Sequence, residues 1–413
     1  MNAKAWRLAL SAAALMAIVS GGRSASGLFL SPLNTASGVG LAGLSFALAL
    51  GQLLVGLAQP VAGAMADRFG AARVIVFGAW IMAATTALPS AWALPWIVSL
   101  SLVASAVAGS AVASNGLLVG EVGRGVPAER TGVALGLVGA GASVGQLLIA
   151  PAAQWAIGRF GWSDALLGVA ALSLVALPLS TTFRRPRAAA DATRPAPQSQ
   201  ASQPVKAVLR QWSFWRVAGS FAVCGFHVAF LAVHMPGVIE RCGLPASLAG
   251  TWIALAGAAN IAGSIAIGFA MKRRDSGVLL VGLYGVRAAG IAALLLLPTS
   301  TTVMLCFALV MGASHMATLP PTSQLVARQF GPRHMGTLFG VVMLVHQVGS
   351  FAGIWLGGWA AAATGSDTLL WVVDITLALV AGMLVWPRVM RRNPAPTFQP
   401  SALGEPALAA SRT

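Results

Sequence analysis

Hydrophobic residues are gathered into twelve long runs along the chain, and short polar segments separate them. An α-helix needs about 20 apolar residues to cross the hydrocarbon core of a bilayer. The runs reach that length, so we predict an all-α membrane protein with twelve transmembrane helices in two six-helix halves. The expected spans are residues 7–31, 41–66, 74–94, 96–120, 131–157, 163–183, 214–240, 246–271, 277–297, 301–326, 335–363 and 367–390.

The longest polar interruption lies between the sixth and the seventh run. It covers residues 184–213 and is rich in Pro, Gln, Ser and Ala, a composition typical of a flexible linker. We therefore predict an N-terminal bundle over residues 1–183, a C-terminal bundle over residues 214–392 and a disordered cytoplasmic tail over residues 393–413.

The first run begins like a secretory signal. Lys4 and Arg7 precede an apolar stretch that ends in small residues, which is the pattern of a signal peptide. The apolar character continues beyond Arg23, however, to the length of a full membrane span. We interpret this run as an uncleaved first helix.

Charge is scarce and unevenly placed. Only 9% of the residues are charged, against about a quarter in soluble proteins, so the chain lacks the charge to cover a water-facing surface. The net charge of +16 would suit nucleic acid, but the Lys and Arg residues lie in alternate loops and at both ends, with four exceptions: Arg23, Arg159, Arg241 and Arg287. This positive-inside pattern predicts a multi-pass protein of the plasma membrane (a bacterial inner membrane) with both termini in the cytoplasm. The bilayer is then the partner, and nucleic acid is not.

No motif indicates a cofactor, a metal site or a catalytic centre. The three cysteines lack CxxC spacing, so neither a disulfide nor a metal site is expected. The predicted helices contain no paired acids, no HExxH motif and no Ser/His/Asp arrangement. We therefore expect no cofactor and no enzyme activity, and without a predicted signalling domain a sensor is disfavoured too.

The turn between the second and the third run carries a concentrated polar cluster, Gly63-Ala-Met-Ala-Asp67-Arg68-Phe-Gly70-Ala-Ala-Arg73. Such a cluster cannot lie in hydrocarbon, so we place it in a tight turn at the membrane surface, where glycine permits unusual backbone angles. It resembles the signature loop of the major facilitator superfamily. That resemblance implies the major facilitator fold, transport by alternating access, a monomer, and a loop that latches one conformation. The alternative is a charged turn that only fixes topology.

Within that superfamily, the first half resembles the monocarboxylate and oxalate/formate carriers. The matching segments are residues 23–32 (Arg-Ser-Ala-Ser-Gly-Leu-Phe-Leu-Ser-Pro), Gln59-Pro60, the glycine-rich fourth and fifth runs, and Gly161-Trp162. Those carriers place in the eighth helix an arginine that grips the substrate carboxylate. Here the eighth run contains Asn260 and no cation, so the assignment of a simple carboxylate is weakened.

Arg23 is the cation that we expect to bind the substrate. A charge at mid-bilayer costs at least about 2.5–3.5 kcal/mol on insertion scales, and in the superfamily helices 1, 4, 7 and 10 line the central cavity. Arg23 lies in the first run, and a guanidinium can grip a carboxylate through two parallel hydrogen bonds. The alternative is that Arg23 binds backbone carbonyls or supports an outer gate.

Other polar residues are candidate substrate contacts. His227, His315 and the pair His346-Gln347 lie near the middle of runs 7, 10 and 11, so three helices bring a histidine to similar depth. Histidine titrates near neutral pH and suits proton coupling or a hydrogen bond to an anion; the alternative is a packing role. Asn115 in the fourth run matches in type and approximate place a polar position of the related carriers.

Arg287 and Asp374 are expected to form a structural ion pair. They lie in runs 9 and 12, which are outer helices that pack near each other in the superfamily. A buried pair removes the cost of two lone charges in lipid. The alternative is a substrate role for Arg287.

The charged residues near the cytoplasmic ends are candidate gating residues. We expect Asp67, Arg68 and Arg73 to meet charged residues of the next cytoplasmic loop, among them Glu121 and Arg124. Such a network would close the inner side and break when the carrier switches between two states.

Together, these patterns predict a carrier that moves a small organic anion, a carboxylate, across the plasma membrane. Import with protons is favoured over exchange, because histidines lie within the spans. The alternative is an efflux carrier for a drug-like or toxic compound, which fits the largely apolar cavity helices and the missing cation of the eighth run.

Overall fold

The computed structural model describes residues 3–184, 203–331 and 334–387, and all its regular elements there are helical. Most of the predicted linker and the whole predicted tail lie outside these residues. The helices are α1 (Ala3–Ala25), η1 (Ser26–Phe29), α2 (Leu30–Ser37), α3 (Leu41–Phe69), α4 (Ala71–Ala91), α5 (Pro95–Val112), α6 (Asn115–Gly125), α7 (Ala128–Phe160), α8 (Trp162–Ser173), α9 (Ala176–Ser180), η2 (Thr181–Phe183), α10 (Val205–Val208), α11 (Trp212–Arg241), α12 (Ser247–Ala270), α13 (Ser276–Leu296), α14 (Thr301–His315), η4 (Met316–Thr318), α15 (Leu319–Phe330), α16 (Met335–Thr364) and α17 (Thr368–Leu384).

These helices supply the predicted membrane spans. Eleven helical stretches of the described residues are long and apolar enough to cross a bilayer, and α17 is a shorter apolar helix in the place of the twelfth. The predicted all-α fold class is confirmed.

Four of the described spans are interrupted. The first bends at η1, the fourth between α5 and α6, the sixth between α8 and α9, and the tenth at η4. The tenth break follows from the sequence, because Pro320 and Pro321 lie in the first turn of α15. Proline has no N–H and its ring clashes with the carbonyl four residues earlier. The preceding residues therefore tighten into η4, and their peptide groups need partners outside the helix.

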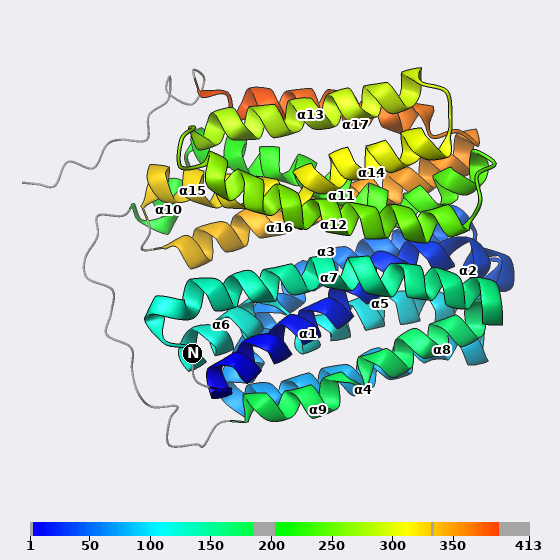
Figure 1. Ribbon diagram of the computed structural model, residues 1–413, viewed down its shortest axis with the longest axis horizontal. Coiled ribbons are helices and arrows are strands. Elements are labelled where there is room, and N and C mark those ends of the chain that lie inside the picture. Colours follow the sequence, from blue (N-terminus) through cyan, green and yellow to red (C-terminus); the bar gives the residue numbers. More distant parts are fainter. Residues whose placement is uncertain (1–2, 185–202, 332–333, 388–413) are drawn as a thin grey trace, which may run out of the picture.

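The helices form two groups that touch along two helix pairs and also where η1 packs on α11. Helices α1 to α9 lie together in one group and α11 to α17 in the other (Figure 1), and α3 packs on α16 while α7 packs on α12. Glycine allows these close approaches. Gly358 of α16 lies against Ser45 of α3, and Gly257 of α12 lies against Gln146 of α7, so closely that an added Cβ would clash at either position.

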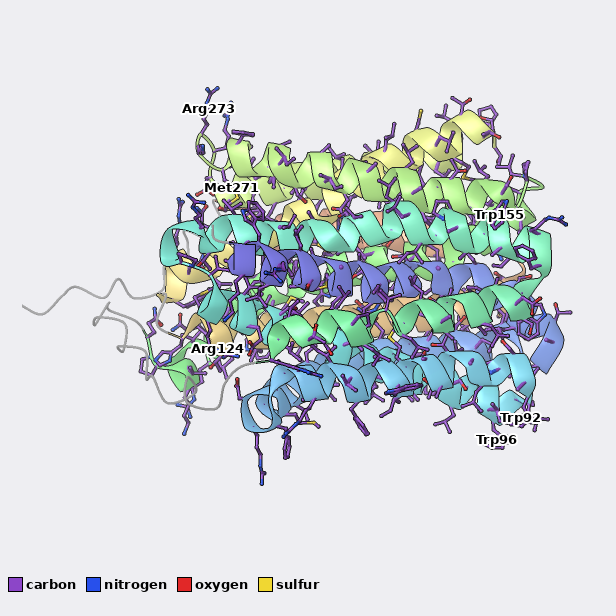
Figure 2. All side chains as sticks on the ribbon, turned by 60° about the horizontal axis from the view of Figure 1, so that its bottom comes forward. Trp92, Trp96, Arg124, Trp155, Met271 and Arg273 are labelled. Atoms are coloured by element: carbon purple, nitrogen blue, oxygen red, sulfur yellow. The ribbon has the colours of Figure 1, made fainter. Side chains whose placement is uncertain are left out.

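The two ends of the bundle differ in chemistry. Figure 2 shows Arg124 and Arg273 at the end where α1 begins, which we call the N-terminal face. It shows Trp92, Trp96 and Trp155 at the opposite end, the far face. Tryptophan gathers at membrane–water interfaces and Lys and Arg mark one side of the membrane. The two faces therefore have the character of the two membrane surfaces.

The two groups are separated at the N-terminal face and packed at the far face. One face of α7 packs on α12, and Gly136 and Gly139 lie on the same face of α7, nearer to the N-terminal face. In the same way, one face of α16 packs on α3, and Gly336 and Gly340 lie on that face of α16, nearer to the N-terminal face. At all four positions an added Cβ would have no atom within 4 Å. The ribbons of α7 and α12 diverge toward the same end (Figure 1). The conformation is therefore open at the N-terminal face.

Candidate functional site

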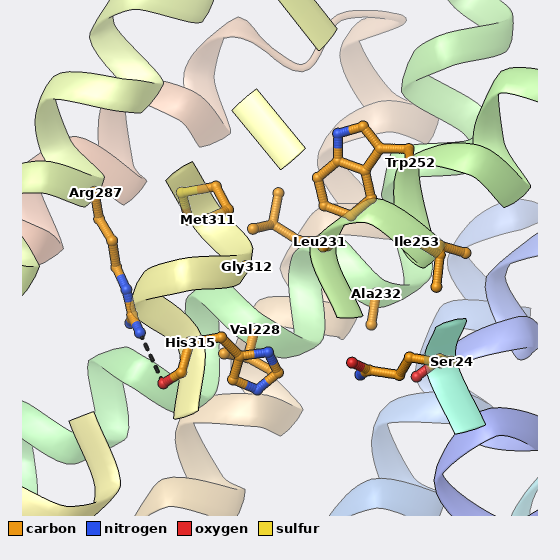
Figure 3. Close-up of a pocket in the computed structure, with 12 residues that line it drawn as sticks. Ser24, Val228, Leu231, Ala232, Trp252, Ile253, Arg287, Met311, Gly312 and His315 are labelled. Carbon is orange, nitrogen blue, oxygen red and sulfur yellow. Dashed lines mark hydrogen bonds between the residues drawn. The ribbon is translucent and has the colours of Figure 1, made fainter. Parts of the chain in front are cut away.

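A cavity lies between the two groups of helices, near the middle of the spans. Counted together with space that is open to solvent, it contains about 490 Å³ of empty volume. Both groups supply its wall (Figure 3): Ser24 of α1, Gln146 of α7, Val228, Leu231 and Ala232 of α11, Trp252, Ile253 and Ala256 of α12, Arg287 of α13, and Met311, Gly312 and His315 of α14.

Arg287 is the cation of the cavity wall, and only 1% of it is exposed. Its Nε donates to Ser314 Oγ (3.2 Å), and its Nη2 donates to the backbone oxygens of Ser314 and His315, the latter at 3.2 Å (Figure 3). The guanidinium carbon also lies 5.6 Å from the centre of the Tyr284 ring. The side chain is thus fixed by three bonds to the break in the tenth span.

The remaining nitrogen of Arg287 is unoccupied. Nη1 is buried and has no hydrogen-bond partner among the described residues. No described carboxylate lies within ion-pair distance of this guanidinium either. A buried cation without a counter-ion is costly, and a free charged N–H is a strong donor to an anion. The cavity therefore offers an anion a preformed binding group.

The rest of the wall is mainly apolar. Leu231, Ile253 and Met311 carry no polar side-chain group, and Trp252 adds a large aromatic face. Trp252 is 4% exposed and its Nε1 has no partner among the described residues. An anion with an apolar body would satisfy the cation and cover this wall.

The expected ion pair between Arg287 and Asp374 is wrong. Arg287 extends toward the break after α14, and Asp374 is completely buried against α11. There His227 Nε2 lies 2.9 Å from Asp374 Oδ1 and 3.1 Å from the backbone oxygen of Asp374. The two helices pack on each other, as α13 and α17, but the two side chains turn toward different neighbours.

The structure separates the residues expected to bind substrate. His315 lines the cavity, whereas His227 does not, because its completely buried ring faces α17. His346 packs on the Phe221 ring, 4.7 Å between centres, and its Nδ1 has no described partner. Of these three candidate histidines, His315 is the one that lines the cavity.

The other three candidate substrate contacts, Arg23, Gln347 and Asn115, are not among the residues that line the cavity. Arg23 is exposed at the end of α1, one residue before Ser24 of the wall. Gln347 is buried and accepts a hydrogen bond from Gln52 Nε2 (3.2 Å) across the two groups of helices. Asn115 begins α6, and its side chain is not among those that the structure describes.

Several predicted gating residues come together at the N-terminal face. Arg124 Nη2 lies 3.3 Å from Asp67 Oδ1 and donates to Glu121 Oε1 at 2.6 Å. Arg68 lies over the ring of its neighbour Phe69, and Arg73 is exposed. The Asp67–Arg124–Glu121 contacts join α3 to α6 within one group of helices, so they hold that group together while this face is open.

The two acids of this cluster should differ in their effect on stability. The side chain of Asp67 is 66% exposed and that of Glu121 only 6%. Exposed ion pairs contribute about 0–1 kcal/mol, so Asp67→Asn should lower the unfolding free energy by less than about 1 kcal/mol. Glu121→Gln should lower the unfolding free energy more than Asp67→Asn does. Thermal unfolding in detergent measures both variants. A larger loss for Asp67→Asn than for Glu121→Gln would contradict this assignment.

Two buried residues at or beside the cavity, Asn260 and Trp252, were not assigned a role from the sequence. Asn260 of α12 bonds both to α7 and to the break in the tenth span, and Trp252 lines the cavity. An amide inside an apolar span is costly without partners, so Asn260 carried a usable signal. Trp252 carried none, because an aromatic residue in a membrane helix is ordinary.

Comparisons with known proteins identify the family of this chain and support its fold. The Major Facilitator Superfamily model matches residues 12–354. The chain is 23% identical over 384 residues to "Monocarboxylate transporter 13" of Rattus norvegicus (92% of this chain, 88% of that protein) and 24% identical over 407 residues to the Bos taurus protein of the same name (98% and 94%). Its fold matches a bacterial homolog of the human lysosomal transporter Spinster in an inward-facing, occupied conformation, with a TM-score of 0.72 at 16% identity over 93% of this chain and 96% of that one.

Proposed function

We propose that this chain, which belongs to the Major Facilitator Superfamily, carries a small organic anion, a monocarboxylate, across the membrane by alternating access. Members of this family are transporters, so the chain is a transporter and not an enzyme, as its sequence predicted. The substrate, the coupling and the direction belong to our proposal.

The observation that carries this function is the unoccupied Nη1 of Arg287 in the cavity wall. A carboxylate there would accept a charge-assisted hydrogen bond and neutralise a buried cation. The apolar wall beside Arg287 favours a substrate with one carboxylate and an apolar body over one with two charges. The names of the two mammalian relatives support the same substrate class.

The proposed direction of opening follows from the placement of charge. Basic residues gather at the N-terminal face, and the positive-inside rule assigns that face to the cytoplasm of a plasma membrane. The opening between the helix groups at this face would then be an inward-facing state. Both termini would lie in the cytoplasm, and the protein would act as a monomer.

The roles that we propose for individual residues follow from their positions relative to the cavity. In this proposal Arg287 replaces Arg23 as the anion anchor, and exposed Arg23 is a second cation that attracts the anion toward Ser24. His315 is a polar contact in the wall, and symport with protons over exchange is the coupling that we propose. Asp67 and Arg124, with Arg68, Arg73 and Glu121, form the latch at the inner face.

A thermal-shift screen tests the substrate class. The purified protein is heated with L-lactate, isovalerate and benzoate, and in parallel with succinate, benzamide and tetraphenylphosphonium. An anion present at 100 times its Kd adds about 2.7 kcal/mol to the native state, so at least one of the three monocarboxylates should raise the unfolding temperature while benzamide does not.

The other outcomes distinguish the alternatives. Stabilisation by tetraphenylphosphonium alone would contradict the anion carrier and favour efflux of a drug-like compound, which the apolar wall also suits. A larger effect of succinate than of any monocarboxylate would keep the anion and overturn the single-carboxylate assignment.

A further inference from the structure

We propose that Asn260 is a positioning residue that couples the Arg287 site to the contact between the two helix groups. Asn260 lies near the middle of α12 and is 1% exposed. Its Oδ1 accepts from the backbone N–H of Met316 (3.0 Å), and its Nδ2 donates to Ser143 Oγ of α7 (3.1 Å). One buried amide thus holds both the break in the tenth span and the opposite helix group.

The first contact places Asn260 next to the residues that hold Arg287. Arg287 binds the carbonyl oxygens of Ser314 and His315, and Asn260 binds the N–H of Met316. These are consecutive residues at the start of the break, where the helix does not satisfy its own peptide groups. A shift of Arg287 toward a bound anion therefore moves the same short segment that Asn260 grips.

The second contact places Asn260 on the hinge between the helix groups. Among the described side chains, Ser143–Asn260 and Gln52–Gln347 are hydrogen bonds that join the two groups. All four residues lie near the midpoints of their helices. From this depth toward the N-terminal face, the glycines of α7 and α16 have no neighbour from the other group, whereas toward the far face the two groups are packed. These two links therefore lie where the groups pivot.

The route from the anion to the pivot is contiguous. It runs from Arg287 through the Ser314–Met316 segment to Asn260 and then to Ser143. Coupling between sites requires an element that both sites bias, and here the break of the tenth span is that element. This role rests on the proposed function, because it needs an anion at Arg287.

Ser143→Ala and Asn260→Ser test the role without changing the cavity wall. Binding is measured by thermal-shift titration with benzoate, isovalerate or L-lactate, whichever stabilises the unmodified protein most, and exchange of that acid is measured in proteoliposomes. Neither residue lines the cavity, so the Kd of each variant for the acid should stay within about twofold of that of the unmodified protein. The maximal exchange rate should fall about tenfold, because each variant loses a buried hydrogen bond that couples the two helix groups.

Gln52→Leu is the matched control, because it removes the other cross-group hydrogen bond and leaves the tenth span untouched. It should lower the exchange rate less than Ser143→Ala does. An unchanged rate in both test variants, or a parallel loss of affinity and rate, would overturn the role of Asn260. Absence of binding of all three acids to the unmodified protein would instead overturn the proposed substrate class.

Discussion

Arg287→Gln is expected to weaken binding of the carried monocarboxylate by roughly 30- to 4,000-fold, the equivalent of the 2–5 kcal/mol typical for truncating one partner of a buried charge pair. The variant removes the cation of the cavity wall, whose Nη1 has no described partner. The affinity of Arg287→Lys for the acid should lie between those of Arg287→Gln and the unmodified protein. An ammonium keeps the positive charge but lacks the planar guanidinium that also binds Ser314 and His315. Thermal-shift titration with the best acid of the panel measures all three.

Arg216 provides the matched control. It is another buried arginine of the second helix group (4% exposed), and its Nη2 donates to the backbone oxygen of Leu384 (2.6 Å), away from the cavity wall. Arg216→Gln should lower stability and leave the affinity for the acid nearly unchanged. Equal losses of affinity in the Arg216 and Arg287 variants would show that the effect comes from the fold and not from the site.

His227→Leu is expected to destabilise the protein by about 3–5 kcal/mol, the usual cost of breaking a buried ion pair from one side. Apart from His227, neither carboxylate oxygen of Asp374 has a close partner among the described residues. Removal of the imidazole thus leaves a completely buried acid alone. Denaturant unfolding in detergent, followed by tryptophan fluorescence, measures the loss.

The reverse substitution should cost less. In Asp374→Leu the backbone oxygen of residue 374 remains to bind His227 Nε2, as it does now at 3.1 Å. The double variant should recover most of the loss of His227→Leu, because an apolar pair of similar volume can replace a buried ion pair. A double variant that is no more stable than His227→Leu would contradict this account of the pair.

The sequence sufficed for the helices and for one contact at the N-terminal face, between Asp67 and Arg124. Membrane spans are read from the length of apolar runs, so the boundaries of α3, α12 and α16 differ from prediction by a few residues. Asp67 and Arg124 were expected to meet because both lie in short loops at the same face, and they lie 3.3 Å apart. Position along a helix is therefore accessible from sequence.

The direction of a side chain around its helix was not accessible. Arg287 and Asp374 were expected on helices that pack together, as α13 and α17 do, but their pairing depends on helix rotation, which tertiary packing sets. Arg287 turns to the break of the tenth span, where it binds the backbone oxygens of Ser314 and His315. Hydropathy counts that span as one helix, so neither the break nor its partner Asn260 could be derived from the pattern of runs.

The most direct test compares an acid with its neutral amide in two proteins. Binding of benzoate and benzamide, or of isovalerate and isovaleramide, is measured for the unmodified protein and for Arg287→Gln. If Arg287 holds the carboxylate, the unmodified protein prefers the acid strongly, and the variant loses most of that preference; the change in preference isolates the interaction. A variant that still prefers the acid as strongly as the unmodified protein would contradict the assignment of the anion site to Arg287.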